Sequence, residues 1–379
     1  MRLPAALAAL ALAAAPRPAA AEPLVAGVAE PVTAMDPHYL NSPSNKNVLC
    51  NIFDALTDND AGLGVVPSLA LSWRLVDPET WEFNLRPGVV FHDGGPFTAE
   101  DARAAFARAP KVPNAPAPFT TYIRQVKAMT VVDPLTIRFH TQGLDPILPN
   151  EAVQIRIMPA RFEAAATDAF NSGAAAIGTG PLRLVSFDQG AKIETARHDA
   201  DWRPRIPWTK ATYRFVPDGA ARAAALLAGD VQLIDNVPSD ALAKLRADPA
   251  IRVATAEIGL RYIFLALDQS RDGPTPHVQG PNGETLDKNP LADRRVREAL
   301  SIAIDRHAIA DRIMEGASTP TGQMMPKGGP GHAEDIPVPR FDPDRARKLL
   351  AEAGYPNGLR IAIHSTKGRY VNDTRVVQA

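Results

Sequence analysis

Residues 67–101 restrict the fold of this chain more than any other stretch, because they specify several local structures in succession. Ser72–Val76 and Trp81–Leu85 alternate apolar with polar residues on either side of an Asp-Pro turn, which predicts a β-hairpin. A glycine-rich connection follows, and Thr98 then stands three residues before Asp101, the spacing of a helix-capping box. The stretch therefore predicts small antiparallel hairpins accompanied by short helices.

The length and charge of the chain limit what it can be. A chain of 379 residues is too long for one small core, so two or three lobes are expected. Its formal net charge of -1 lacks the basic excess of a nucleic-acid-binding protein, which argues against a nucleic-acid partner. The 36 prolines suit many short elements and turns, and strand and helix patterns alternate, which indicates an α/β fold.

The amino terminus has the pattern of a secretory signal over residues 1–21. Arg2 precedes the apolar run Ala5–Ala15, and three small residues, Ala19 to Ala21, precede Glu22. The run is too short to span a bilayer as a helix. The single cysteine, Cys50, excludes an internal disulfide and lies far from any lipid-attachment position. We expect a free, soluble periplasmic protein in which Cys50 is a small buried apolar residue.

Several further elements follow from periodicity and caps. We expect core helices over Asn45–Leu56 and within Asp293–Ala317, an irregular proline-rich connection at Lys111–Phe119, and a hairpin from Val126 to His140. Aspartates should cap helices after Asp218, Asp305 and Asp342. The remaining expected elements are strands at Leu24–Val28, Thr212–Val216, Ile251–Thr255, Tyr262–Leu267 and Leu359–His364, with helices at Tyr122–Val126, Ser239–Arg246 and from Gly368.

A known family shares three of these motifs. Residues 67–101 contain the order P-x-L-A-x-S-W followed by W-x-F-x-L-R-x-G-V-x-F-H-D-G-x-P-F-T-A-E-D. In this order they resemble the solute-binding proteins of peptide and nickel ABC importers, extracellular family 5. Two later stretches resemble the same family: D-x-R-V-R-x-A-L-x-x-A-I-D-R from Asp293, and F-D-P-x-x-A-x-x-L-L-x-E-A-G-Y from Phe341. The resemblance covers residues 22–379, but members usually continue for well over a hundred residues more, so the chain looks truncated at its carboxyl end.

The resemblance implies a type II periplasmic binding protein with two lobes and an extra subdomain in the first. On that pattern residues 22–49 and 178–256 form the core of lobe I, residues 50–177 form the inserted subdomain, and residues 257–379 form an incomplete lobe II. The turn Met35–Tyr39 would border the ligand cleft. The sequence Gly178-Thr179-Gly180-Pro181 would mark the return to lobe I, where its glycines either approach a ligand or simply form a tight turn.

A binding protein of this kind closes its lobes over a solute, and closure excludes water. Aromatic, amide and arginine side chains near the lobe junctions are the natural ligand contacts, since arginine pairs best with carboxylates. The predicted ligand-binding residues are Tyr39, Asn41, Tyr122, Thr179, Arg261, Tyr262, Arg369 and Tyr370. We expect a monomer that captures short peptides for an inner-membrane ABC permease, without a cofactor or a metal.

Other functions fit the sequence less well. The family also takes up nickel complexes, haem, opines and oligosaccharides, and a truncated remnant that transports nothing is a further alternative. An enzyme lacks support, because no H-E-x-x-H, no zinc-spaced Cys-His cluster and no G-x-S-x-G occurs. Only His92 beside Asp93 suggests catalysis, and a turn role suits that pair better. The arginines Arg294, Arg295 and Arg297 are expected on a solvated helix face.

Overall fold

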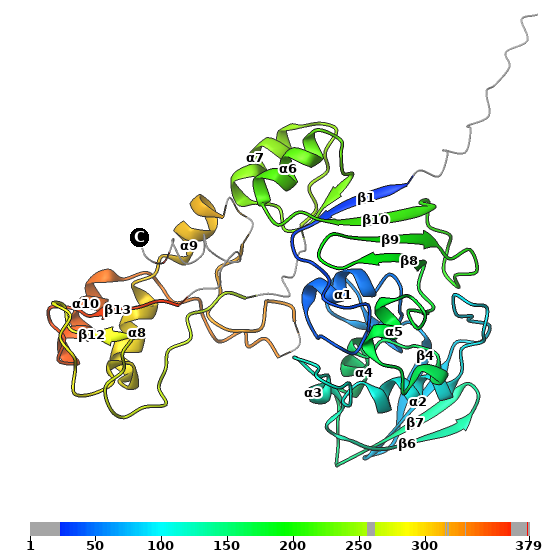
Figure 1. Ribbon diagram of the computed structural model, residues 1–379. Helices are drawn as coiled ribbons and strands as arrows, with labels where there is room; N and C mark the ends of the chain where they lie inside the picture. The colour runs from blue at the N-terminus through cyan, green and yellow to red at the C-terminus, as the bar shows by residue number, and fades with distance from the viewer. Residues whose placement is uncertain are drawn as a thin grey trace, which may run out of the picture.

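The computed structural model describes residues 23–255, 262–314, 316, 318–329, 331–364 and 377. Its first sheet has the strand order β11-β1-β10-β9-β8 (Figure 1). The strand β1, Leu24–Val28 as predicted, runs parallel to β10 (Lys210–Phe215) and to β11 (Leu233–Ile234). The antiparallel strands β9 (Lys192–Arg197) and β8 (Leu182–Asp188) complete the sheet. The chain thus leaves this sheet after β1 and returns to it only at β8.

A four-stranded antiparallel sheet contains the hairpin predicted from residues 67–101. Its order is β4 (Ala70–Asp77), β5 (Thr80–Leu85), β7 (Thr136–Thr141) and β6 (Val126–Asp133). One face packs under α2 (Ala99–Arg108), where fully buried Phe83, Phe106 and Phe139 meet. The Thr98 amide donates to Asp101 at 2.7 Å, which confirms the capping box.

Short elements connect the two sheets. They are α1 (Pro43–Leu49), β2 (Thr57–Asn59), β3 (Val65–Pro67), α3 (Thr120–Ile123), α4 (Leu148–Glu151), α5 (Thr167–Asn171) and the 3-10 turns Ala152–Gln154 and Ala160–Phe162. The helix expected over Asn45–Leu56 is wrong beyond Leu49. Its apolar side chains are buried, but the Asn51 and Ile52 carbonyls accept from Leu182 and Gly180 instead of continuing the helix.

Most of the regular secondary structure in the later part of the described chain is helical. It contains α6 (Gly219–Leu227), α7 (Ser239–Ala247), α8 (Arg294–Ile302), α9 (Arg306–Ala308) with a π-turn at Ile309–Ile313, and α10 (Pro343–Glu352), together with the 3-10 turn Pro290–Ala292 and the strand pair β12 (Val278–Gln279) and β13 (Arg360–Ile361). The caps predicted at Asp218, Asp305 and Asp342 are confirmed. Within the described ranges, no helix is both long and apolar enough to cross a membrane.

Some expected strands are absent or shorter. Ile251–Thr255 and the stretch 262–267 form no strand, because nothing among the described residues pairs with them. The strand expected over Leu359–His364 is limited to Arg360–Ile361, where Val278 and Gln279 supply its partner. The helix expected from Gly368 lies outside the described residues. A strand pattern alone therefore did not ensure a strand.

Arginines of α8 do more than contact solvent. Arg295 donates to the Glu352 carbonyl at 2.7 Å and so caps the end of α10, and it also pairs with Asp293. Arg297 donates to the Leu291 carbonyl at 2.9 Å. Arg294 and Arg295 are exposed and Arg297 is partly exposed, as expected of a solvated helix face, and the contacts of Arg295 and Arg297 also connect α8 to its neighbours.

Candidate functional site

Two of the predicted ligand contacts, Asn41 and Tyr122, touch each other. The Asn41 Nδ2 donates to the Tyr122 hydroxyl at 2.8 Å. The Asn41 backbone amide donates to the Ala117 carbonyl at 3.2 Å, and Leu40 forms a parallel bridge with Ala117. The proline-rich connection, irregular as predicted, is therefore held beside the segment that carries Asn41. Tyr39 lies partly exposed on that same segment.

A small surface pocket opens beside Asn41. Two charged residues line it, Lys46 and Arg156, and Lys46 lies on α1 and donates to the Gln154 side chain at 3.2 Å. Burial lowers the pKa of Lys46, and the positive charge of Arg156 lowers it further. The residues that line the pocket are Pro37, Leu40, Asn41, Ser42, Asn45, Lys46, Leu49, Phe119, Gln154 and Arg156.

A buried ion pair involves Asp36, the residue before Pro37 of the pocket lining. The Asp36 carboxylate, 0% exposed, accepts from both terminal nitrogens of Arg108 at 2.7 Å and from the Thr167 hydroxyl at 2.8 Å. Burial alone would raise the pKa of Asp36, but the hydrogen bonds and charge of Arg108 outweigh burial, so the pKa is lowered. The Arg108 guanidinium also lies 4.6 Å from the centre of the Phe170 ring. The aspartate of the turn Met35–Tyr39 therefore points into the protein.

His38 connects this ion pair to the wall of the pocket. Its Nδ1 accepts from Arg108 at 3.2 Å, so its Nε2 carries the proton and donates to the Arg156 carbonyl at 2.8 Å. Its ring meets Phe119 edge to face, with 6.0 Å between the ring centres. Burial, with the neighbouring Arg108 charge, lowers the pKa of His38 to about 4, which keeps the imidazole neutral near pH 7. Both Phe119 and Arg156 line the pocket, so this turn fixes part of its wall.

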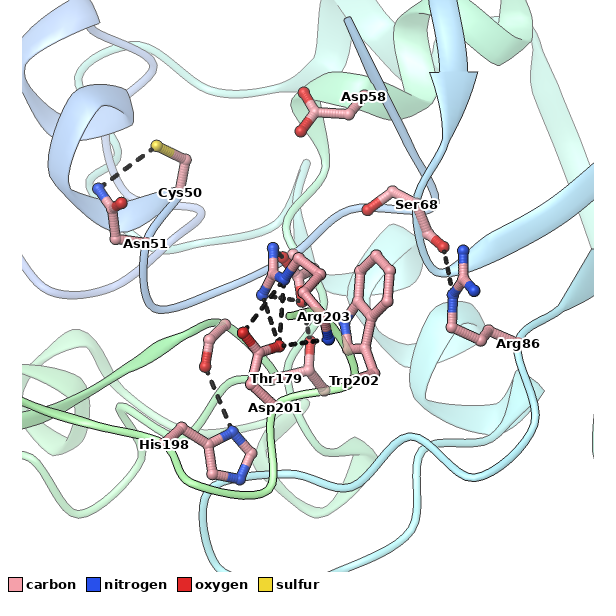
Figure 2. Close-up of polar contacts among 12 residues, drawn as sticks. Cys50, Asn51, Asp58, Ser68, Arg86, Thr179, His198, Asp201, Trp202 and Arg203 are labelled. Carbon is pink, nitrogen blue, oxygen red and sulfur yellow. Dashed lines mark hydrogen bonds and ion pairs between the residues drawn. The ribbon is translucent and has the colours of Figure 1, made fainter. Parts of the chain in front are cut away.

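Thr179 does not belong to this surface. It is fully buried, and its hydroxyl donates to the Asp54 carboxylate at 2.9 Å. The same carboxylate accepts from the Trp202 indole at 3.1 Å and from Arg203 at 2.8 Å, and Figure 2 shows Trp202 and Arg203 converging on the Thr179 loop. Arg86 covers the Trp202 ring at 4.2 Å. The hydroxyl of Thr179 is therefore engaged within the protein.

The two glycines beside Thr179 serve the chain itself. A Cβ on Gly178 would lie 2.0 Å from the Ile52 carbonyl oxygen, and one on Gly180 would lie 2.5 Å from the Asn51 carbonyl oxygen. Side chains at these positions would therefore collide with backbone. Of the two roles left open for this loop, close backbone packing explains the glycines without a ligand.

The pair His92 and Asp93 is also occupied. His92 Nδ1 accepts from the Gly178 amide at 3.1 Å, and its Nε2 donates to the Gly180 carbonyl at 3.0 Å. Burial lowers the pKa of His92 to about 4, and Asp93 forms an ion pair with Arg161. Both ring nitrogens hold a loop in place, so a turn role accounts for the pair.

The remaining predicted contacts lie apart from this pocket or outside the described residues. Tyr262 is 41% exposed, and its hydroxyl donates to the Met324 sulfur at 3.5 Å. Its ring lies 5.3 Å from that of Phe264. Arg261, Arg369 and Tyr370 fall outside the described residues. The structure thus brings together Asn41 and Tyr122, with Tyr39 on the same segment.

The sequence also left some residues of this site unnoticed. Lys46 was assigned to a core helix, and Arg156 lies inside the apolar run of residues 155–158, where an isolated charge was a usable signal. Cys50 is half-buried, and burial raises the pKa of its thiol. Among the described residues, no group of three or more His, Cys, Asp or Glu side chains is placed to hold a metal ion.

The fold defines a class of proteins. The oligopeptide-binding protein AppA from Bacillus subtilis, in complex with a nonapeptide, matches with a TM-score of 0.69 and 22% identity, over 89% of this chain and 65% of that chain. The periplasmic binding protein DppA from Helicobacter pylori, in complex with the peptide STSA, matches with a TM-score of 0.68 and 23% identity, over 89% and 67% of the two chains. The chain has the fold of a type II periplasmic binding protein, mixed α/β as expected.

The family is shown by a match over most of the chain. Residues 64–379 match the model of bacterial extracellular solute-binding proteins, family 5 middle, and the chain belongs to this family, as its motifs suggested. The glutathione-binding protein GsiB of Salmonella paratyphi A is 29% identical over 354 residues, which cover 92% of this chain and 64% of that protein. The chain therefore spans slightly less than two thirds of the length of this relative.

Proposed function

We propose that this protein is the extracytoplasmic solute-binding component of an ABC importer and that it captures short peptides or peptide-like solutes. The observation that carries the proposal is the contact between Asn41 and Tyr122 beside a pocket with polar and cationic lining, on a family 5 fold. An amide and a phenol supply donors and acceptors for a peptide backbone, which many sequences share. The relatives point the same way, since GsiB is named for glutathione and AppA was solved with a nonapeptide.

The proposal includes a mode of action. Residues 22–49 with 178–256 form the core of lobe I, residues 50–177 are inserted in it, and residues 257–379 belong to lobe II. Closure of the lobes over the solute would exclude water and present a surface to the permease. The protein acts as a periplasmic monomer rather than as an enzyme. His92, the one histidine that suggested catalysis, is engaged at both ring nitrogens, so neither nitrogen is free to transfer a proton.

Isothermal titration calorimetry tests the proposal. The purified protein is titrated with glutathione and with pooled di- to pentapeptides, and we expect saturable heat from at least one of them. Tyr122→Phe removes only the hydroxyl that accepts from Asn41 and should weaken binding, whereas Tyr213→Phe, on β10 and apart from this pocket, should leave it unchanged. Absence of heat with every probe, from protein that melts cooperatively, would sink the proposal.

A further inference from the structure

The structure has three buried arginines, and one of them differs from the others. Among the described residues, Arg108, Arg156 and Arg222 are 4%, 6% and 3% exposed. Arg108 donates to the Asp36 carboxylate, and Arg222 donates to backbone carbonyls that include Val216 and Asn236 at 2.7 Å. Across the described ranges, the Arg156 guanidinium has no hydrogen-bond acceptor and no ion-pair partner. No nitrogen of Arg156 is among the fully buried atoms that lack a partner, and Arg156 lines the pocket, so its guanidinium remains accessible to a ligand.

A second cation lies close to Arg156. Lys46 lines the same pocket, and the pKa of its ammonium is lowered by burial and then by the charge of Arg156, so the two like charges act on each other. The hydrogen bond of Lys46 to Gln154 joins it to a neutral amide. Asp58 acts on Lys46 through its charge, but it is exposed and no ion pair within 4.0 Å joins the two. The pocket therefore gathers positive charge that the protein does not neutralise.

Nearby acidic groups are committed elsewhere. Asp36 is bound by Arg108, and Asp54 is bound by Arg203, Thr179 and Trp202. No aspartate or glutamate lines the pocket itself. An anion that entered would meet two cations and no repelling carboxylate.

The backbone of Arg156 is held in place by the protein before any ligand binds. Its carbonyl accepts from His38 at 2.8 Å, and its backbone forms an antiparallel bridge with Ala55. A guanidinium on a fixed backbone offers a planar pair of donors with little ordering cost, which matches the two oxygens of a carboxylate.

We propose that Arg156 and Lys46 form an anion subsite that binds a carboxylate group of the captured solute. The subsite rests on the proposed function and narrows it to acidic solutes, including peptides with a free carboxyl terminus. Arg156 supplies the bidentate contact, and Lys46 supplies a second positive charge. Asn41, which lines the same pocket, then provides a neutral contact next to the charged one.

Calorimetry with a matched peptide pair tests this subsite. The probes are trialanine with a free carboxyl terminus and trialanine amide, both blocked by acetylation at the amino terminus. We expect the free acid to bind about ten- to a hundredfold more tightly, the range for a hydrogen bond to a charged group. The ratio should fall to about one in Arg156→Gln and should shrink in Lys46→Gln. The matched control Arg183→Gln alters an exposed arginine of β8 and should keep the full ratio.

A second readout does not depend on peptides. It is the melting temperature of the protein in sodium acetate, in sodium phosphate and in sodium chloride of equal ionic strength. Acetate should raise the melting temperature of the wild-type protein and of Arg183→Gln, but not that of Arg156→Gln. Without added anion Arg156→Gln should melt at or above the wild-type temperature, because it removes a positive charge that repels Lys46.

The outcomes separate the subsite from the proposed function. Equal binding of acid and amide, with no shift in acetate, would overturn the subsite while the peptide-binding function stands. A shift in acetate that Arg156→Gln abolishes, with no binding of glutathione or any peptide, would support the subsite and overturn the function. A larger shift in phosphate than in acetate would overturn the assignment to carboxylates.

Discussion

Removal of Arg108 should destabilise the protein more than removal of any exposed arginine. In Arg108→Met the Asp36 carboxylate stays fully buried and keeps only two of its four hydrogen bonds, those from the Thr167 hydroxyl at 2.8 Å and the His38 amide at 3.0 Å. Breaking a buried pair at one partner costs about 3–5 kcal/mol. That loss is a large part of a typical total of about 5–15 kcal/mol.

Urea unfolding followed by tryptophan fluorescence at pH 7 measures the loss. Arg108→Met combined with Asp36→Asn should be more stable than the sum of the two single losses predicts, because no unpaired charge remains. Arg347→Met breaks an ion pair with Asp344 whose side chains are 74% and 92% exposed, so it should change stability by less than about 0.5 kcal/mol. A loss below about 1 kcal/mol in Arg108→Met, or strict additivity in the double variant, would refute the reasoning.

Three further predictions concern the loop packing, the buried histidines and a helix cap. Gly178→Ala should cost at least about 3 kcal/mol in urea unfolding, because its Cβ would meet the Ile52 carbonyl oxygen at 2.0 Å; a near-neutral result would contradict that packing. The pKa values of His38 and His92 in the folded state are both lowered from 6.5 to about 4, so between these pH values the unfolded state binds more protons than the folded state. The free energy of unfolding should therefore fall by up to roughly 3 kcal/mol per histidine as the pH drops from 6.5 to 4. A urea midpoint that stays constant over that range would contradict neutral buried rings. Asp218→Ala should cost about 1 kcal/mol by urea unfolding, since the Ala221 amide loses its 2.7 Å acceptor, and Asp218→Asn should cost less.

Local sequence signals predicted the local structures well. The hairpin of β4 and β5 follows from alternation and an Asp-Pro turn, and the caps at Asp218, Asp305 and Asp342 follow from residue type alone. These features depend on neighbours within a few residues. The helix expected over Asn45–Leu56 failed beyond Leu49 because its later carbonyls bond a loop about 130 residues away in sequence, which periodicity cannot register.

The candidate site was only partly accessible from the sequence. Asn41 and Tyr122 were found as polar residues near an expected lobe junction, although nothing in the sequence indicated that they touch. The hydrogen bond from Thr179 to Asp54 was not apparent from the sequence, because the two residues are 125 positions apart. Arg156 was missed because what distinguishes it is the absence of an acceptor among the described residues, and such an absence becomes visible only in three dimensions.

The position of β1 has a consequence for how the protein acquires its structure. Leu24 of β1 pairs with Ala211 of β10, and Ala26 of β1 pairs with Leu233 of β11. The first strand to be synthesised therefore pairs only after the last two strands of its sheet have been made. Contacts this distant in sequence slow folding, because a long loop must close before they form. β1 therefore lacks its strand partners until residues 210–234 have been made. The arrangement that places β1 between β10 and β11 thus makes the first strand of the sheet depend on its last two for hydrogen-bonded partners.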